Sequence, residues 1–292
     1  MNRGGRAWRG FFPVGEELTS GRPDMKEGLY FGTELPACHP LVEAGIPLHG
    51  PNLFPDNMPE LKESVLQYIE AMNKLGHSLM GAVAASLGLP QTYFQEKYMR
   101  PEPLSLFRIF NYPKDLLASI DGEERWGVGE HTDYGVLTIL RQDSCGGLQV
   151  KNRSNAWIEA PPVHGSFVIN IGDMLEKMTS GLYRSTPHRV KNTASKDRLS
   201  FPFFFDPNFS AVIQPVALPP MLAGSIHRGD EGYTRWDGSS VEDFKGTYGE
   251  YIIRKVFKVF PDLAKEANID ETISAMAAAV AELNARNAIA CK

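Results

Sequence analysis

The sequence predicts a mainly β protein, in which helices flank a central sandwich or barrel of strands. Short β-prone runs follow one another between residues 104 and 216: LSLFRIF, GVLTIL, GLQV, SFVINI, HRVKN, RLSFPFFF and AVIQPV. Turn residues separate these runs, as in Ser144–Gly147 and Pro161-Pro162. Helical periodicity is confined to the segments before and after. Many short strands at this spacing indicate a sandwich or barrel, and not alternating β and α units.

The first 58 residues carry little regular periodicity, and Gly and Pro recur along them. Such a segment usually wraps a scaffold as ordered loops, so we expect no strand here. A helix follows. Asn57 and Glu60 fit a capping box, and Gly88 with Pro90 ends the segment. Apolar residues recur at near-helical spacing between these limits: Leu61, Val65, Ile69, Met72, Leu79 and Val83.

The chain returns to helix after the β-prone region. Ser240 and Asp243 indicate a capped start, and YGEYIIRKVFKVF ends at Pro261. A last helix is predicted at about 270–286, with apolar residues Ile273, Met276, Val280 and Leu283. No repeat or low-complexity linker interrupts the chain. We therefore predict a single domain, 1–292, with N-terminal loops and helix (1–100), a β core (101–216) and a C-terminal loop and helices (217–292).

Length and composition limit the possible functions. A chain of 292 residues with 42% hydrophobic residues is typical of a globular protein. Its net charge of −5 argues against a nucleic-acid or membrane-surface binder. Cys38, Cys145 and Cys291 are widely spaced and form no CxxC, which suits a reducing compartment. No apolar run reaches the roughly 18 residues of a spanning helix. We expect a cytoplasmic monomer that acts on a small molecule.

The first candidate site residues are His131 and Asp133, the only His-x-Asp pair in the sequence. Residues i and i+2 of a β-strand face the same side, so both side chains would project together from an extended segment. A third ligand must come from elsewhere, and His188 lies in another β-prone run, STPHRV. Two imidazoles and one carboxylate form the facial triad that binds Fe(II) in non-haem oxygenases. Zinc at the same ligands is an alternative.

Arg198 and Ser200, the only Arg-x-Ser pair, are again two residues apart in the next β-prone run. A guanidinium binds a carboxylate through two parallel hydrogen bonds, and a nearby hydroxyl can donate another. The pair therefore predicts an anion site beside the metal. Each motif taken alone has a high false-positive rate. The specific signal is their order in a strand-rich segment: HxD, then His, then RxS.

Longer runs around these motifs resemble the isopenicillin N synthase-like branch of the Fe(II)/2-oxoglutarate-dependent dioxygenases. The resemblance extends to about Leu263 and includes FNYP, GEHTDYGVLTIL, GGLQV, NIGDMLEKMTSGLYRSTPHRV and DRLSFPFFFDP. It implies a double-stranded β-helix, or jelly-roll, core of the cupin type. It also implies that Fe(II) is bound by His131, Asp133 and His188. The same resemblance assigns the 2-oxoglutarate carboxylate to Arg198, Ser200 and Tyr112, and places Asn170 near the metal.

The resemblance implies an enzyme that uses Fe(II), 2-oxoglutarate and O2. Such enzymes release succinate and CO2 while they hydroxylate, desaturate or cyclise a small organic molecule. Aromatic and apolar residues close to the motifs are expected to line the substrate pocket: Phe203, Phe205, Tyr183 and Leu148. The sequence does not name the substrate or choose among the three outcomes.

Two other functions stay open at this point. In isopenicillin N synthase and 1-aminocyclopropane-1-carboxylate oxidase the matching Arg/Ser pair serves a different carboxylate, so Arg198 and Ser200 could bind the substrate without 2-oxoglutarate. A non-catalytic jelly-roll binding module is the second alternative. Family members usually begin with a further segment that contains a strand and a helix. We expect its absence to reflect either a natural short form or a partial gene model.

Overall fold

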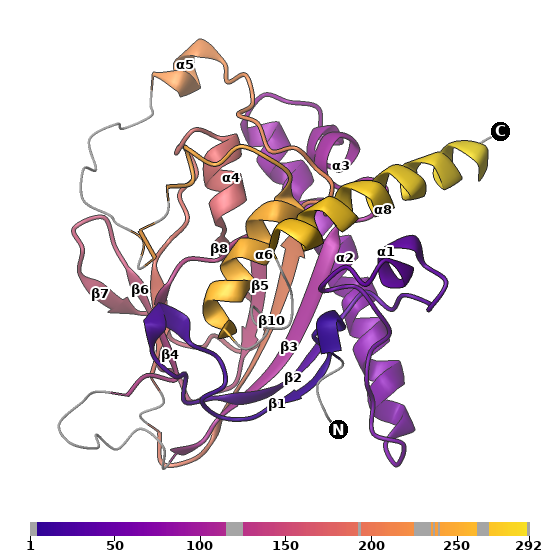
Figure 1. Ribbon diagram of the computed structural model, residues 1–292. Helices are drawn as coiled ribbons and strands as arrows, with labels where there is room; N and C mark the ends of the chain where they lie inside the picture. Colours follow the sequence, from indigo (N-terminus) through magenta and orange to yellow (C-terminus); the bar gives the residue numbers. More distant parts are fainter. Residues whose placement is uncertain are drawn as a thin grey trace.

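Two antiparallel sheets form the centre of the molecule (Figure 1). The computed structural model describes residues 5–114, 125–191, 194–224, 235, 237–238, 240–261 and 269–290. The larger sheet has the strand order β1 (Gly10–Phe12), β2 (Glu27–Gly32), β3 (Leu104–Tyr112), β10 (Arg198–Asp206), β5 (Leu137–Gln142), β8 (Val168–Ile171). The smaller sheet has the order β4 (Val128–His131), β9 (His188–Val190), β6 (Leu148–Lys151), β7 (Trp157–Glu159). This arrangement confirms the predicted mainly β core with flanking helices, in the form of a jelly roll.

The α-helices are α1 (Pro40–Glu43), α2 (Pro59–Ser86), α3 (Tyr93–Tyr98), α4 (Asp173–Met178), α5 (Pro220–Ala223), α6 (Tyr248–Val259) and α8 (Ile269–Ala290). Two short 3-10 turns, η1 (Gly5–Ala7) and η2 (Thr19–Gly21), lie near the N-terminus. Figure 1 shows α2 running along the large sheet, whereas α6 lies on the side of the smaller sheet. The helices therefore cover the β core from two sides.

Strand parity divides the side chains of the large sheet into two sets. On β3, the residues Leu106, Arg108, Phe110 and Tyr112 face the smaller sheet and line a cavity between the two sheets. Phe107 faces the other way and packs on Tyr68 of α2, with ring centroids 4.7 Å apart. The two faces of the sheet consequently serve two purposes: one face packs against α2 and the other forms a site.

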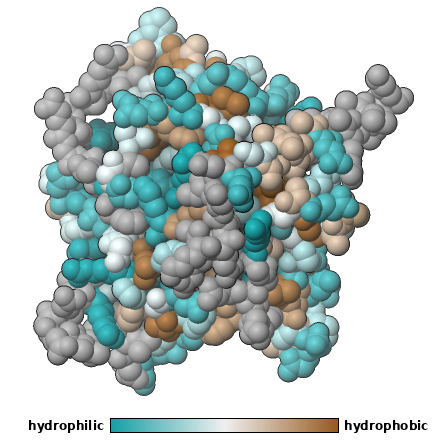
Figure 2. Space-filling model, in the orientation of Figure 1, coloured by the Kyte–Doolittle hydropathy of each residue, from teal (hydrophilic) through white to brown (hydrophobic). Residues whose placement is uncertain are grey.

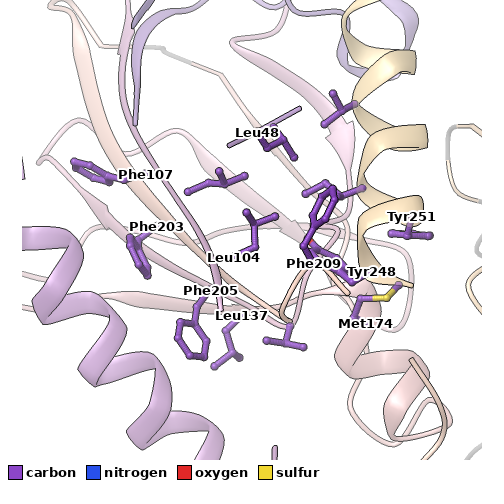
Figure 3. Close-up of a cluster of buried hydrophobic side chains, with 14 of the residues drawn as sticks. Leu48, Leu104, Phe107, Leu137, Met174, Phe203, Phe205, Phe209, Tyr248 and Tyr251 are labelled. Atoms are coloured by element: carbon purple, nitrogen blue, oxygen red, sulfur yellow. The ribbon is translucent and has the colours of Figure 1, made fainter. Parts of the chain in front are cut away.

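Helix α2 lies very close to β10. A Cβ atom at Gly76 would lie 2.5 Å from Cδ2 of Phe205, so no larger residue fits there without movement. The next residue, His77, packs edge-on against the same ring at 5.0 Å between centroids. Figure 3 shows Phe107, Phe203 and Phe205 on the side of the sheet that faces this helix.

Helix α6 begins at a capping box. Thr247 accepts a hydrogen bond from the Glu250 backbone N–H, and the Glu250 carboxylate accepts one from the Thr247 N–H. Phe260, which follows the helix, packs on Trp8 at 4.5 Å between ring centroids. Residues near both ends of the described chain thus meet in a single hydrophobic cluster that extends from Trp8 to Ala279.

Two expectations about the strands are wrong. The N-terminal 58 residues contain β1 and β2, which extend the large sheet beyond β3. Gly28 and Gly32 permit this pairing, because an added Cβ would lie 2.7 Å from the Phe110 ring at the first position and would collide with the Arg9 guanidinium at the second. The AVIQPV run forms no strand and pairs through one isolated bridge, between Val212 and Thr247. Pro215 has no N–H to donate to a sheet.

Both predicted helix caps are also wrong. Helix α2 starts with Pro59 after Met58, and the structure records no side-chain cap there. Proline at the first helical position supplies the start signal in place of Asn57. Helix α6 starts at Tyr248, eight residues beyond Ser240, whose hydroxyl instead accepts a hydrogen bond from the Asp243 N–H in a turn. In α8, Met276 is buried as the spacing predicted, while the Leu283 side chain lies outside the described residues.

On the face drawn in Figure 2, hydrophilic residues predominate and hydrophobic residues form small, separate areas. No helix in the described part of the chain combines the length and the hydropathy that a bilayer-spanning segment requires.

Candidate active site

Three side chains from three places in the sequence meet at one end of the cavity. His131 ends β4 and His188 starts β9, and the two residues are paired across the antiparallel sheet. Asp133 follows two residues after His131. One ligand atom from each of the three residues lies within 4.8 Å of the others, so the group could hold a metal ion. The structure therefore brings together all three residues that the sequence predicted as ligands.

The backbone fixes the orientation of both imidazoles. Nδ1 of His131 lies 2.8 Å from the Gly129 carbonyl oxygen, and Nδ1 of His188 lies 3.0 Å from that of Thr186. A carbonyl accepts only from N–H, so each Nδ1 carries a proton and each Nε2 is the atom left to bind a metal. The two Nε2 atoms lie 3.8 and 3.6 Å from Oδ1 of Asp133. Such carbonyl contacts are the usual way in which a protein orients metal-binding histidines.

Protonation states also suit a cation. Burial, followed by the neighbouring His188, lowers the pKa of His131 to about 4, so this imidazole is neutral at neutral pH. Burial alone would raise the pKa of Asp133, but His188 and His131 lower it below its ordinary value. The Asn170 amide donates to Oδ2 of Asp133 at 2.6 Å, which holds the carboxylate in place and leaves Oδ1 directed at the histidines. Two imidazoles and one carboxylate match the donor set of a ferrous site.

The anion pair lies at the neighbouring end of β10. Arg198 is completely buried, and its Nε donates to the Gly146 carbonyl at 2.6 Å while Nη2 donates to Gln142 at 3.1 Å. Its third nitrogen, Nη1, is buried without a hydrogen-bond partner among the described residues. Tyr112 is paired opposite Arg198, and its ring lies 4.8 Å from the guanidinium carbon. An unpartnered donor on a buried cation is the feature that a bound carboxylate would satisfy.

The cavity between the sheets has a volume of about 170 Å³, and Arg198 is not among its lining residues. The three candidate metal ligands line it, as do Ser200 and Tyr112. Apolar residues from β3, β10 and α6 form much of the remaining wall: Leu106, Phe110, Phe204, Ile252, Val256 and Val259. A polar end beside a mainly apolar chamber is typical of a site for a small organic molecule.

Comparison with known proteins decides the family. Residues 103–207 match the family model described as the 2OG-Fe(II) oxygenase superfamily. A Dictyostelium discoideum protein named as an iron/ascorbate oxidoreductase is 53% identical, over 88% of this chain and 75% of that protein. The chain belongs to the 2OG-Fe(II) oxygenase superfamily.

Other relatives of this oxygenase agree. A 1-aminocyclopropane-1-carboxylate oxidase of Dictyostelium mucoroides is 37% identical, over 88% of this chain and 76% of that protein. The crystal structure of a full-length Neurospora crassa protein in complex with alpha-KG has a TM-score of 0.66 and 26% identity, and covers 86% of this chain and 73% of that one. The protein is thus an enzyme of the Fe(II)/2-oxoglutarate dioxygenase superfamily, and the non-catalytic binding module is the wrong alternative.

Three of the predicted pocket residues lie elsewhere in the oxygenase. Phe203 and Phe205 point from β10 toward α2, because Ser200 and Phe204 occupy the cavity face of the same strand (Figure 3). The Tyr183 hydroxyl lies 2.7 Å from the Ser86 hydroxyl at the end of α2, away from the cavity. Among the four predictions, Leu148 alone lines the cavity.

Sequence analysis missed a polar group in the cavity wall. Lys26 contacts Asp24 at 2.5 Å and Glu17 at 2.6 Å, and the Tyr30 hydroxyl donates to Glu17 at 2.5 Å. Burial alone would lower the pKa of Lys26, but Asp24 and Glu17 raise it above its ordinary value. Arg108 lies beside Tyr30, with the guanidinium carbon 4.1 Å from the ring centroid. Strand parity counted back from Tyr112 would have placed Arg108 on the cavity face.

Asp206 is a further buried carboxyl in the cavity wall. Its Oδ2 accepts a hydrogen bond from Tyr248 at 2.5 Å, while Oδ1 has no partner among the described residues. Burial raises the pKa of Asp206 to about 7. The folded protein therefore retains a proton that the unfolded chain loses near pH 4, and wild-type stability falls as the pH rises toward 7.

The Asp206→Asn variant is expected to remove this loss of stability. Its advantage over the wild type should grow by on the order of 2–3 kcal/mol between pH 5 and pH 8, because asparagine does not ionise. Urea unfolding of both apoproteins at the two pH values measures the difference. Parallel stability curves for the two proteins would contradict the assignment.

Proposed function

We propose that His131, Asp133 and His188 hold Fe(II), and that Arg198, Ser200 and Tyr112 hold the far carboxylate of 2-oxoglutarate. Two unmet requirements support this proposal, one at the three candidate metal ligands and one at Arg198. At the first, two Nε2 atoms and a carboxylate oxygen lie close together, and among the described residues no cationic side chain lies between them. At the second, Nη1 of Arg198 is buried without a hydrogen-bond acceptor among the described residues. A metal ion satisfies the first requirement, and a dicarboxylate that reaches from metal to Arg198 satisfies the second.

Each residue then has a defined task. The Gly129 and Thr186 carbonyls hold the imidazoles as the tautomers that can bind a metal, and Asn170 orients Asp133. Arg198 and Ser200 fix the cosubstrate by its distal end, so that its other end faces the histidines. When bound, Fe(II) and 2-oxoglutarate supply the activation of O2, with loss of CO2 and formation of succinate. The apolar wall keeps water from the reacting atoms and positions the substrate carbon that is hydroxylated, desaturated or cyclised.

The second candidate is a reaction like that of the 1-aminocyclopropane-1-carboxylate oxidases, in which Arg198 and Ser200 would bind the substrate itself. One experiment separates the two candidates. The Fe(II)-loaded protein is expected to consume O2 and release one succinate per O2 when 2-oxoglutarate is present, and to show no uptake when ascorbate replaces it. Uptake that requires ascorbate and an amino acid, without succinate, would favour the oxidase.

Further parts of the proposal come from sequence. We infer a small-molecule substrate from the size of the cavity. We also propose a monomeric protein of the cytoplasm without nucleic-acid partners. The acidic composition supports the absence of nucleic-acid partners, and the three scattered cysteines support the cytoplasm.

A further inference from the structure

Arg108 is a buried cation in the middle of the cavity wall. It lies on β3, which β10 separates from β5, and it is paired with Tyr30 of β2. Its side chain is 5% exposed and lines the cavity. It lies four residues before Tyr112 on the same face of the strand, and thus belongs to the chamber but not to the Arg198 end.

Protein groups use only part of the Arg108 guanidinium. Nη1 donates to the carbonyl oxygens of Phe31 at 2.8 Å and Phe107 at 3.1 Å. Nε and Nη2 make no hydrogen bond with the described residues, and they are not enclosed, so they are accessible from the cavity. Two donors of a fixed planar fork therefore face the space where a ligand binds.

No carboxylate of the described residues forms an ion pair with Arg108. Two other buried cations of the core are paired with carboxylates: Lys26 contacts Asp24 and Glu17, and Arg235 contacts Asp173 at 3.1 Å. A buried charge without a counter-ion is costly, and proteins retain one where a ligand completes the pair. Burial lowers the pKa of Arg108 to about 10, which leaves it charged at neutral pH.

Nearby acidic groups do not fill this role. Glu17 is engaged by Lys26 and Tyr30, and the Asp206 carboxyl accepts from Tyr248. The Oδ1 atom of Asp206 is pressed against Gly135, where it would collide with an added Cβ, so no ligand fits between them. The same cavity also has apolar lining residues, with Leu106 and Phe204 from the sheet and Val256 and Phe260 from α6 and the residue that follows it.

We propose that Arg108 binds the organic substrate, and that this substrate is a small, mainly apolar carboxylic acid. Its carboxylate pairs with Nε and Nη2 of Arg108, and its apolar body fills the chamber between β10 and α6. A cavity of about 170 Å³ limits the acid to a small molecule. This assignment rests on the proposed function, because it requires Arg198 to be occupied by 2-oxoglutarate.

The test uses matched acids and amides that differ in charge and hardly in shape: phenylacetate with phenylacetamide, and hexanoate with hexanamide. Binding is measured by anaerobic calorimetry on the full chain loaded with Fe(II) and saturating 2-oxoglutarate. We expect at least one acid to bind the wild type about tenfold or more tightly than its amide, the preference that a charge-assisted pair confers. In Arg108→Met the preference should fall to within about twofold, and Arg108→Lys should be intermediate.

Two controls accompany the measurement. Arg141→Met removes an exposed arginine from the far face of β5, on the other side of β10, and should leave the preference unchanged. The affinity of Arg108→Met for 2-oxoglutarate and its melting temperature show whether the variant is folded with an intact cosubstrate site.

Each other outcome overturns a specific statement. Equal binding of acid and amide by the wild type, or no binding of any acid, overturns the role of Arg108 while 2-oxoglutarate turnover persists. Acids that displace 2-oxoglutarate would be bound at Arg198, and this result would also overturn the role of Arg108. Failure of the wild type to bind 2-oxoglutarate overturns the proposed function instead.

Discussion

Replacing Asp133 with alanine is expected to abolish Fe(II) binding and succinate production. The carboxylate supplies one of three ligands, and without it the two histidines cannot close a face of the metal. Removal of a supporting residue outside the ligand set typically costs roughly 10- to 100-fold in metal affinity, so loss of a ligand should exceed roughly 100-fold. Anaerobic Fe(II) titration and a succinate assay measure the two effects.

Asn170→Ala provides the matched control for that variant. It deletes the 2.6 Å hydrogen bond to Asp133 but leaves all three ligands in place. Its affinity for Fe(II) should therefore fall by about 10- to 100-fold, and added metal should restore turnover. Wild-type succinate output from Asp133→Ala would disprove the metal assignment. A folded Asp133→Ala protein, shown by a cooperative melt, is required for the comparison.

Arg198→Lys is expected to weaken 2-oxoglutarate binding by roughly 10- to 100-fold, the cost of losing strong charged hydrogen bonds. Lysine keeps the positive charge, but it cannot donate to Gly146 and Gln142 while it also faces the cavity. The KM for 2-oxoglutarate should rise far more than kcat falls, because the residue binds the end of the cosubstrate that does not react.

Arg141→Lys is the control for this substitution, since it makes the same chemical change on the exposed far face of β5. Its kinetics should match the wild type. An unchanged KM for 2-oxoglutarate in Arg198→Lys, with a raised KM for the organic substrate, would reverse the assignment and favour the oxidase-like alternative.

The metal site was predictable because its signal is local. His131 with Asp133, and Arg198 with Ser200, are pairs whose spacing alone places both members on one side of an extended chain. The pairing of His131 with His188 was not predictable from spacing, because it depends on the register between β4 and β9. The choice of His188 as the third ligand therefore depended on the resemblance to the family.

Strand parity would have excluded Phe203 and Phe205 from the pocket. Once Arg198 and Ser200 are assigned to the cavity face of β10, residues 202, 204 and 206 must share that face, and 203 and 205 must point away. The same count from Tyr112 leads to Arg108. The predictions of Phe203 and Phe205 as pocket residues failed because these side chains lie on the other face of β10.

The fold predictions failed where tertiary contacts override local propensity. Gly28 and Gly32 weaken a strand in isolation, yet each gives room for a neighbouring side chain, and β2 joins β3 along its full length. The AVIQPV run has strand composition but finds no partner strand among the described residues. Whether a segment forms a strand depends on the neighbouring strand with which it can pair, and a single sequence does not show which strands are neighbours.

The contact of Trp8 with Phe260 places a residue of the N-terminal segment and the residue that follows α6 in one wall of the cavity. Any molecule that fills the chamber touches both, and it binds the folded chain but not the unfolded one. By thermodynamic linkage, the free energy of binding must therefore also hold the N-terminal and C-terminal segments together. A bound ligand is therefore expected to slow proteolysis of the segments that carry Trp8 and Phe260, because it stabilises the folded chain.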